Sequence, residues 1–203
     1  MTAGRVGAVD GRAVLPTIRT ARLVLRAFVR GDLADLVRLD TDPRVMAYIA
    51  DGRPQAPDVI AKALDRVLRY PTLNAMLGVW RASLRGSDAF IGWYSLKYAG
   101  RSTDIEIGYR LLPAAWGRGY ATEGAAAMRD HGFGPVGLSR IIGVTHPDNL
   151  ASQRVLAKIG MRDEGWGRYY DRRLRLFAVE RPGASASAPA RGTAERGARG
   201  RDA

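Results

Sequence analysis

The 203-residue sequence contains no cysteine and only two histidines, His131 and His146. The lack of cysteine excludes disulfides, thiolate metal ligands and a covalent acyl-cysteine intermediate. The two histidines are far apart and have no carboxylate partners at metal-ligand spacing, so we expect no metal site. Long hydrophobic runs are also missing, since no segment approaches the roughly 18 to 20 apolar residues that cross a bilayer. We therefore expect a cytoplasmic protein without membrane contact.

Length and composition favour one folded domain. With 46% hydrophobic residues, the chain can close one sizeable core but is too short for two ordinary domains. The Gly- and Ala-rich residues 1–16 predict a flexible extension, residues 17–181 the folded domain, and residues 182–203, poor in large apolar side chains, a disordered tail. We see no internal repeat.

The charge balance is strongly basic, with a net charge of +12. This excess would attract an anionic ligand, or an acidic environment such as the ribosome, by long-range steering. Solvated arginine-rich faces would give the same balance. The sequence has no helix-turn-helix, RNA-binding motif or aromatic-basic ladder, so we do not expect specific nucleic-acid binding.

The order of predicted strands and helices indicates an α+β fold. Periodicity and turn residues predict strands at 22–27, 77–81, 89–98, 104–111, 140–145, 168–170 and 172–179. Helices are predicted at 32–41, 57–70, 122–131 and 150–158. This mixed order predicts a sheet with helices on both faces.

The most informative stretch is Trp116-Gly117-Arg118-Gly119-Tyr120-Ala121, which lies between a predicted strand and a predicted helix. Its two glycines let the backbone turn tightly and let a ligand approach without a Cβ in the way. The helix that follows leaves partial positive charge at the loop. The stretch therefore predicts an anion site for a pyrophosphate; the alternative is a plain strand-to-helix turn.

A second strand-to-helix unit follows in residues 138–158. Its helix has a natural N-cap in Asp148 or Asn149 and a natural C-terminal stop at Gly160.

Three separated motifs resemble the GNAT superfamily of acyl-CoA-dependent N-acetyltransferases. They are Ile105–Leu111, the Trp-Gly-Arg-Gly-Tyr-Ala loop, and Asn149-x-x-Ser152-x-x-Val155-Leu156-x-Lys158-x-Gly160-Met161. The opening segments Thr20–Arg26 and Asp32–Leu36 resemble the branch with the ribosomal-protein N-terminal acetyltransferases, the RimJ/RimL-like proteins. The resemblance covers roughly Thr17 to Glu180. It implies a mixed, mostly antiparallel sheet with helices on both faces, and acetyl-CoA as co-substrate.

The resemblance also assigns cofactor-binding residues. The pyrophosphate would lie against main-chain N–H groups of Gly117, Arg118, Gly119, Tyr120, Ala121 and Thr122. The pantetheine arm and thioester would lie along Tyr109, Arg110 and Leu111, held by main-chain hydrogen bonds where two strands splay apart. Asn149 matches the family's cofactor-contacting asparagine, and Ser152 follows on the same helix start.

The chemistry needs a base for the amine and a proton for the leaving thiolate. Glu106 is our candidate base, because it lies two residues before Gly108 on the cofactor strand; alternatively it faces solvent or pairs with an arginine. Many family members supply a tyrosine as proton donor seven residues after the asparagine, but Leu156 stands there. Ser152 is the nearest replacement, unless it only caps its helix.

These residues predict an acetyl-CoA-dependent N-acetyltransferase, monomeric or homodimeric, that works by direct attack in a ternary complex. The preferred acceptor is the N-terminal α-amine of a protein or peptide, because at pH 7 roughly 14% of α-amines are neutral against roughly 0.04% of lysine amines. One alternative is acetylation of a small amine such as an antibiotic, a polyamine or an amino-sugar. Another is a non-catalytic acyl-CoA-binding regulatory domain.

Overall fold

The computed structural model describes residues 15–73 and 76–183. Residues 1–14 of the predicted extension and 184–203 of the predicted tail lie outside the described residues. Leu15 is buried, and the carbonyl of Pro16 accepts a hydrogen bond of 2.8 Å from the indole of Trp80. The described chain is therefore attached to the core from Leu15 onward.

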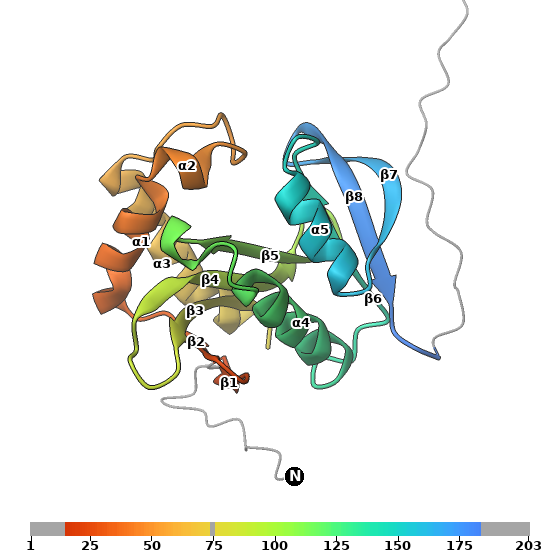
Figure 1. Ribbon diagram of the computed structural model, residues 1–203, viewed down its shortest axis with the longest axis horizontal. Helices are drawn as coiled ribbons and strands as arrows, with labels where there is room; N and C mark the ends of the chain where they lie inside the picture. The colour runs from red at the N-terminus through yellow and green to blue at the C-terminus, as the bar shows by residue number, and fades with distance from the viewer. Residues whose placement is uncertain (1–14, 74–75, 184–203) are drawn as a thin grey trace, which may run out of the picture.

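Within the described residues, eight strands form one sheet in the order β1-β2-β3-β4-β5-β6-β8-β7 (Figure 1). The strands are β1 Ile18–Arg19, β2 Leu23–Ala27, β3 Gly78–Leu84, β4 Phe90–Tyr98, β5 Ile105–Leu111, β6 Arg140–Thr145, β7 Arg162–Tyr169 and β8 Arg172–Glu180. The neighbours β5 and β6 are parallel, and the other pairs are antiparallel. This confirms the predicted mixed, mostly antiparallel sheet.

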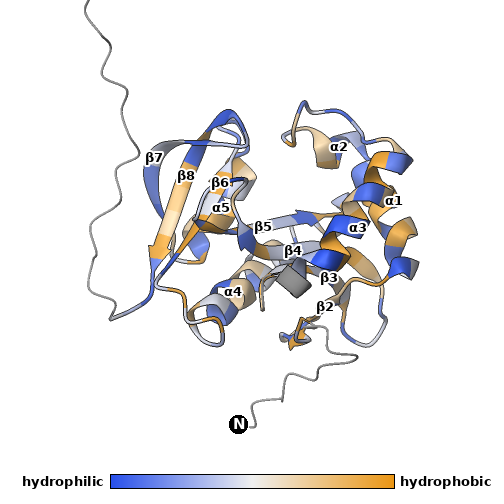
Figure 2. Ribbon diagram, turned by 180° about the vertical axis from the view of Figure 1, so that it is seen from behind, coloured by the Kyte–Doolittle hydropathy of each residue, from blue (hydrophilic) through white to orange (hydrophobic). Residues whose placement is uncertain are grey.

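Helices cover both faces of the sheet, as predicted (Figure 1). They are α1 Leu33–Asp40, α2 Pro43–Met46, α3 Pro57–Leu73, α4 Tyr120–Phe133 and α5 Leu150–Lys158, with short 3-10 turns at Arg30–Asp32 and Pro113–Ala115. Hydrophobic and hydrophilic residues alternate around α1 and α3 (Figure 2), and their apolar sides pack with Val79 and Phe90 on one face of the sheet. Residues of α4 and α5 pack with Trp80 and Tyr94 on the opposite face.

The main difference from the sequence prediction is strand β7, which spans Arg162–Tyr169 rather than residues 168–170. It is an edge strand whose residues are mostly exposed, and its register with β8 shifts between Asp163 and Gly165. Two glycines and an irregular register weaken the period-two pattern, so the sequence hides this strand. The short elements β1 and α2 were not predicted either.

Helix α4 lies very close to the sheet because its first turns carry small residues. A Cβ added to Gly124 would lie 2.1 Å from Cζ of Tyr94, which is fully buried. The Tyr94 hydroxyl donates a 2.6 Å hydrogen bond to the carbonyl of Tyr120, the first residue of α4. The core of β4 therefore fixes where this helix begins, and with it the position of the preceding loop.

Strands β5 and β6 diverge. Strand β5 pairs with β4 over its whole length, from Tyr98 opposite Ile105 to Gly92 opposite Leu111. With β6, in the described residues, it pairs at one position, Glu106 opposite Ile142. Beyond that position the main chain of β5 loses its neighbour on one side, which is the splay expected beside Tyr109, Arg110 and Leu111.

Candidate active site

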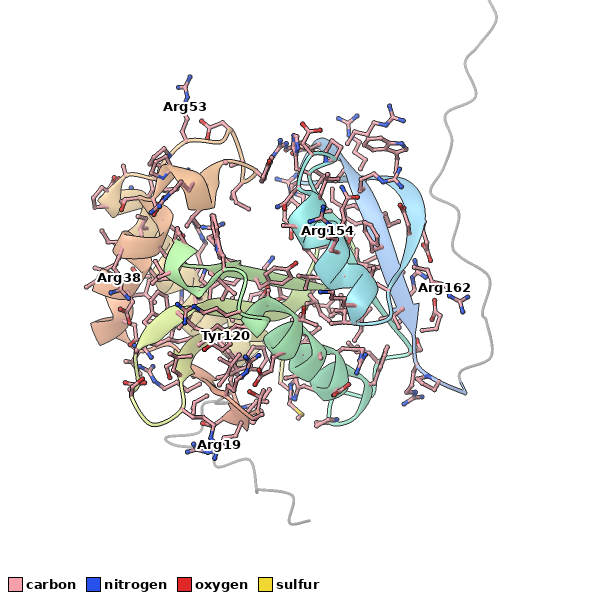
Figure 3. The ribbon with its side chains drawn as sticks, in the orientation of Figure 1. Arg19, Arg38, Arg53, Tyr120, Arg154 and Arg162 are labelled. Atoms are coloured by element: carbon pink, nitrogen blue, oxygen red, sulfur yellow. The ribbon has the colours of Figure 1, made fainter. Side chains whose placement is uncertain are left out.

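The loop before α4 has the backbone geometry of an anion site. Gly117 has φ 71° and Gly119 has φ 79°, both in the left-handed region that favours glycine. Gly119 is the N-cap of α4 and supplies no side-chain cap. The first N–H groups of a helix have no intrahelical acceptors, so they are available to an anion at this end. Gly117, Arg118 and Gly119 are exposed, and Tyr120 marks the helix start (Figure 3).

The turn between β1 and β2 is bonded to this loop and to α4 through Thr20 and Arg22. Arg22 Nε donates to Glu123 Oε2 at 2.6 Å, Arg22 Nη1 donates to the carbonyl of Arg118 at 2.9 Å, and Thr20 donates to Glu123 Oε1 at 2.5 Å. Burial raises the pKa of Glu123, but the hydrogen bonds from Thr20 and Arg22 outweigh it, so the net pKa is lowered. An ionised Glu123 in the first turn also suits the positive end of the helix.

Neighbouring residues of β5 point to opposite faces of the sheet. The Tyr109 hydroxyl reaches Ser152 on α5, whereas Arg110 forms an ion pair of 2.5 Å with Asp40 at the end of α1 and lies over the ring of Trp93. The side chain of Arg110 therefore braces α1, and only its main chain faces the divergence. The carbonyl of Leu111 accepts from the Trp116 indole at 2.8 Å, which ties the strand to the glycine loop.

Glu106 lies where β5 and β6 meet, on the same face of the sheet as Arg110. The residue is only 8% exposed, and its Oε2 accepts a short hydrogen bond from the hydroxyl of Tyr170. Lys97, the residue opposite Glu106 on β4, donates to the same hydroxyl at 3.1 Å. Burial raises the pKa of Glu106, opposed by the charge of Lys97 and the hydrogen bond from Tyr170. A carboxyl group with a raised pKa is suited to proton transfer near neutral pH.

A second group of polar side chains lies at the start of α5, on the face of the sheet opposite to Glu106. Asn149 Oδ1 accepts from the N–H of Ser152 at 3.0 Å, so Asn149 is the N-cap of α5. The hydroxyl of Ser152 lies 2.9 Å from that of Tyr109. Burial raises the pKa of Tyr109 to about 12, partly offset by the hydrogen bond with Ser152. The Ser152 hydroxyl thus contacts Tyr109 of β5, while the cap of α5 comes from Asn149.

The structure places Lys97 and Asp40 beside the candidate residues, and it gives Tyr170 a partner that the sequence did not indicate, Glu106. Tyr170 and Asp171 form the two-residue turn between β7 and β8, with φ values of 55° and 57°. Lys97 could have been found by aligning β4 with β5, since the register puts it opposite Glu106. Tyr170 has no comparable signal, because its partner lies 64 positions away in the sequence.

Two observations concern metals and membranes. Among residues 15–73 and 76–183, no group of three or more metal-ligating side chains is placed to hold an ion. The buried His131 ring instead contacts the carbonyl of Met76 at 2.9 Å, and burial lowers its pKa. In the same part of the chain, no helix has the length and apolar character required to span a bilayer.

Comparison with known proteins gives the family. Residues 22–162 match the model of a protein family described as "Acetyltransferase (GNAT) domain". The FsC-acetyl coenzyme A-N(2)-transacetylase of Aspergillus fumigatus is 34% identical over 154 residues, which is 72% of this chain and 65% of that longer protein. The uncharacterized N-acetyltransferase YnaD of Bacillus subtilis is 36% identical over 156 residues, covering 73% of this chain and 84% of that one.

Solved structures agree. A GNAT-family acetyltransferase from Bacillus anthracis has a TM-score of 0.69 and 25% identity, covering 81% of this chain and 98% of that chain. The ribosomal alpha-N-protein acetyltransferase RimL in complex with coenzyme A has a TM-score of 0.68 and 15% identity, covering 81% and 98%. The aminoglycoside acetyltransferase AAC(6')-Ib in complex with coenzyme A has a TM-score of 0.65 and 19% identity, covering 78% and 95%.

Fold and comparisons together show that this protein is an acetyl-CoA-dependent N-acyltransferase. The chain belongs to the GNAT acetyltransferase family. The fold that it shares with RimL and with the aminoglycoside enzyme does not select an acceptor, because those two proteins have the same architecture and are named for different acceptors.

Proposed function

We propose that this protein transfers an acetyl group from acetyl-CoA to the N-terminal α-amine of a protein or peptide, by direct attack in a ternary complex. The observation that carries the proposal is the place of Glu106: a buried carboxyl group at the point where β5 and β6 separate, on the strand that leads to the glycine loop. The proposed base thus lies on β5, and the proposed cofactor loop lies in the segment that follows β5.

The residues present fit acetyl-CoA as co-substrate. The main chain from Gly117 to Thr122 offers N–H donors at an exposed helix start to the pyrophosphate. The main chain of Tyr109, Arg110 and Leu111 faces the divergence, where it could pair with the amide groups of pantetheine. Asn149 and Ser152 lie at the start of α5, on the other side of that divergence. The thioester supplies the activated acetyl group.

Glu106 removes the proton of the acceptor as the amine attacks the thioester carbon. The new C–N bond forms, the C–S bond breaks, the acetyl group moves to nitrogen, and the amine proton passes to the Glu106 carboxylate directly or through water. A positioned carboxylate of this kind contributes about 10²- to 10⁴-fold to the rate. A main-chain N–H of β5 would hold the developing oxyanion.

The leaving thiolate needs a proton, and the Ser152 and Tyr109 hydroxyl pair is our candidate donor. Leu156, where many relatives of this fold carry a tyrosine, is buried and apolar. The Tyr109 ring comes from the cofactor strand itself and remains protonated at neutral pH, because burial raises its pKa to about 12. Ser152 orients that phenol through the 2.9 Å contact between the two oxygens.

Two carboxylates on the α1 and α2 side are already paired with arginines, which weakens the case for a polycationic small molecule. Asp40 is paired with Arg110, and Asp42 is paired with Arg44. Carboxylates that are already neutralised in this way attract a multiply charged amine weakly. An α-amine also needs less help to become neutral than a lysine side chain.

A small-molecule amine is the second candidate. The Aspergillus fumigatus relative is named an FsC-acetyl coenzyme A-N(2)-transacetylase, and one structural neighbour is an aminoglycoside acetyltransferase. These two similarities support a small-molecule acceptor.

Thiol release from acetyl-CoA in the presence of an acceptor panel tests the proposal. The panel contains peptides with a free N-terminus, the same peptides with a blocked N-terminus and an internal lysine, an aminoglycoside and a polyamine. We expect turnover with free N-termini and at least tenfold lower kcat/KM with blocked peptides. Higher kcat/KM with the small amines would establish the second candidate, and no thiol release with any amine would indicate a non-catalytic acyl-CoA-binding domain.

A further inference from the structure

The turn between β7 and β8 delivers a tyrosine to the buried carboxyl group of Glu106. A two-residue hairpin turn with positive φ at both central positions normally carries Asn-Gly or Asp-Gly, because glycine, asparagine and aspartate adopt these angles more readily than bulky side chains such as tyrosine. Here Tyr170 and Asp171 occupy those positions, with φ 55° and 57°. Strain of this kind persists only where the surrounding structure holds it, and it is often associated with function. The Tyr170 hydroxyl is held by Glu106 and by Lys97.

Lys97 fixes the direction of the hydrogen bond between Tyr170 and Glu106. The lysine ammonium has three donors and no acceptor, so the Tyr170 oxygen must accept from Lys97 Nζ at 3.1 Å. The phenolic proton is then free to point only to the other partner, Glu106 Oε2. A hydrogen bond donated to a carboxylate stabilises its ionised form.

The remaining groups around Glu106 do not replace this contact. The Tyr169 hydroxyl donates to Asp104 at 2.7 Å, and the Tyr70 hydroxyl accepts from the N–H of Tyr98 at 3.0 Å. On the β6 side, Glu106 faces the apolar Ile142. The titratable and charged groups that interact with Glu106 are Lys97 from β4, Tyr169 from β7 and Tyr170 from the turn. Asp104, before β5, acts on Tyr169, and Tyr70, from α3, acts on Tyr170.

We propose that Tyr170, oriented by Lys97, is a positioning residue that keeps the buried Glu106 carboxyl group ionised and leaves its second oxygen, Oε1, to take the proton of the acceptor amine. The role of Glu106 as the base rests on the proposed function. The hydrogen bond from Tyr170 to Glu106, and its effect on the ionisation of Glu106, do not depend on it. The hairpin thereby has a role in setting the pH range of the enzyme.

The groups around Glu106 determine in which direction its pKa changes when Tyr170 loses its hydroxyl. Burial raises the pKa of Glu106, while the charge of Lys97 and the hydrogen bond from Tyr170 oppose that rise. Removing the Tyr170 hydroxyl therefore raises the pKa of Glu106 further. Burial and the charge of Glu106 in turn raise the pKa of Tyr170, so its hydroxyl remains a donor at neutral pH.

The test compares Tyr170→Phe with Tyr169→Phe. Both remove one phenolic oxygen from the same hairpin, but the Tyr169 hydroxyl donates to Asp104 and not to Glu106. With a good acceptor, the acid limb of kcat/KM should move up by about one to two pH units in Tyr170→Phe. It should stay in place in Tyr169→Phe, and both variants should keep the wild-type affinity for acetyl-CoA.

A direct titration separates this inference from the proposed function. The carboxyl carbon of Glu106 can be followed by NMR in protein labelled with ¹³C-glutamate and assigned by its loss in Glu106→Gln. A higher pKa in Tyr170→Phe than in wild type and Tyr169→Phe supports the positioning role, even if no acceptor in the panel is acetylated. An unchanged Glu106 pKa in folded Tyr170→Phe overturns it, even if the protein proves to be an active acetyltransferase. Lys97→Met should raise the pKa in the same direction, and failure to do so would contradict the orienting role of Lys97.

Discussion

At the scale of single residues, Glu106 illustrates how burial and partner choice decide between alternatives that the sequence leaves open. Exposure to solvent or pairing with an arginine was the alternative to a catalytic carboxylate. The side chain is buried, and its hydrogen-bond partner is a tyrosine rather than an arginine. Its catalytic role remains a prediction, and a single substitution can test it.

The substitution Glu106→Gln should lower the activity and raise the stability of the folded protein. Activity with any good acceptor should fall at least about a hundredfold at neutral pH, because glutamine cannot take a proton. The folded protein should become more stable at the same pH. Burial raises the folded pKa of Glu106, so its contribution to stability is complete below the unfolded pKa and is lost as the pH rises through the folded pKa.

Thermal unfolding of the Glu106→Gln variant at several pH values measures the stability effect. Near about pH 4, where the carboxyl group of the wild-type protein is protonated when folded, the difference from wild type should disappear. Full activity of this variant across the pH range would show that Glu106 is not the base.

Ser152 shows the same dependence on partner choice. From the sequence, it could cap its helix or act near the thioester. The cap is the side chain of Asn149, and the Ser152 hydroxyl lies against Tyr109 instead. The contact between Ser152 and Tyr109 comes from packing α5 against β5, which no local sequence pattern reveals.

At the scale of elements, the glycine loop and α4 were the most predictable part of the molecule. The predicted helix at 122–131 is found as Tyr120–Phe133, directly after the two glycines. Local rules suffice here, because a left-handed turn needs glycine and a helix that touches a sheet needs small residues. The Cβ contact of 2.1 Å at Gly124 expresses the second rule.

The charge preference of this loop can be isolated with Gly119→Asp and Gly119→Asn. Both substitutions place a Cβ 3.3 Å from Nη2 of Arg22 at a φ of 79°, which both residues tolerate better than most, so the backbone cost is matched. The aspartate alone adds negative charge at the helix start. We expect acetyl-CoA to bind at least about tenfold more weakly to the Asp variant than to the Asn variant, as measured by calorimetry. Wild-type affinity in both variants would rule out this loop as the pyrophosphate site.

At the scale of the whole molecule, the basic balance should accelerate capture of the cofactor. The net charge is +12, and arginines such as Arg19, Arg38, Arg53, Arg154 and Arg162 lie on different sides of the molecule (Figure 3). A distributed positive charge attracts an anion from a distance without forming a specific site.

The association rate constant of acetyl-CoA should therefore fall several-fold between about 50 mM and about 500 mM salt, as measured by stopped-flow mixing. Acetyl-pantetheine, which lacks the phosphates, provides the control, and its association should barely change over this range. Equal salt dependence for the two ligands would contradict electrostatic steering.

The sequence by itself determined the elements that depend on near neighbours in the chain. These are the glycine turn before α4, the start of α5 to within one residue, most strands and helices, and the absence of any cysteine chemistry. Backbone conformation and capping are set within a few residues, so their signals are local. The sequence did not predict the full length of the edge strand β7, because its register with β8 is irregular.

Only the tertiary structure decided which side chains meet Glu106 and Ser152. Tyr170 approaches Glu106 from a hairpin 64 positions later, and Arg110 reaches Asp40 across 70 positions. Such contacts depend on strand order and register, because a shift of one residue would turn each side chain to the opposite face of the sheet. The chain composition supplies the chemical groups, and the pairing of β4, β5 and the β7–β8 hairpin decides which of them act together.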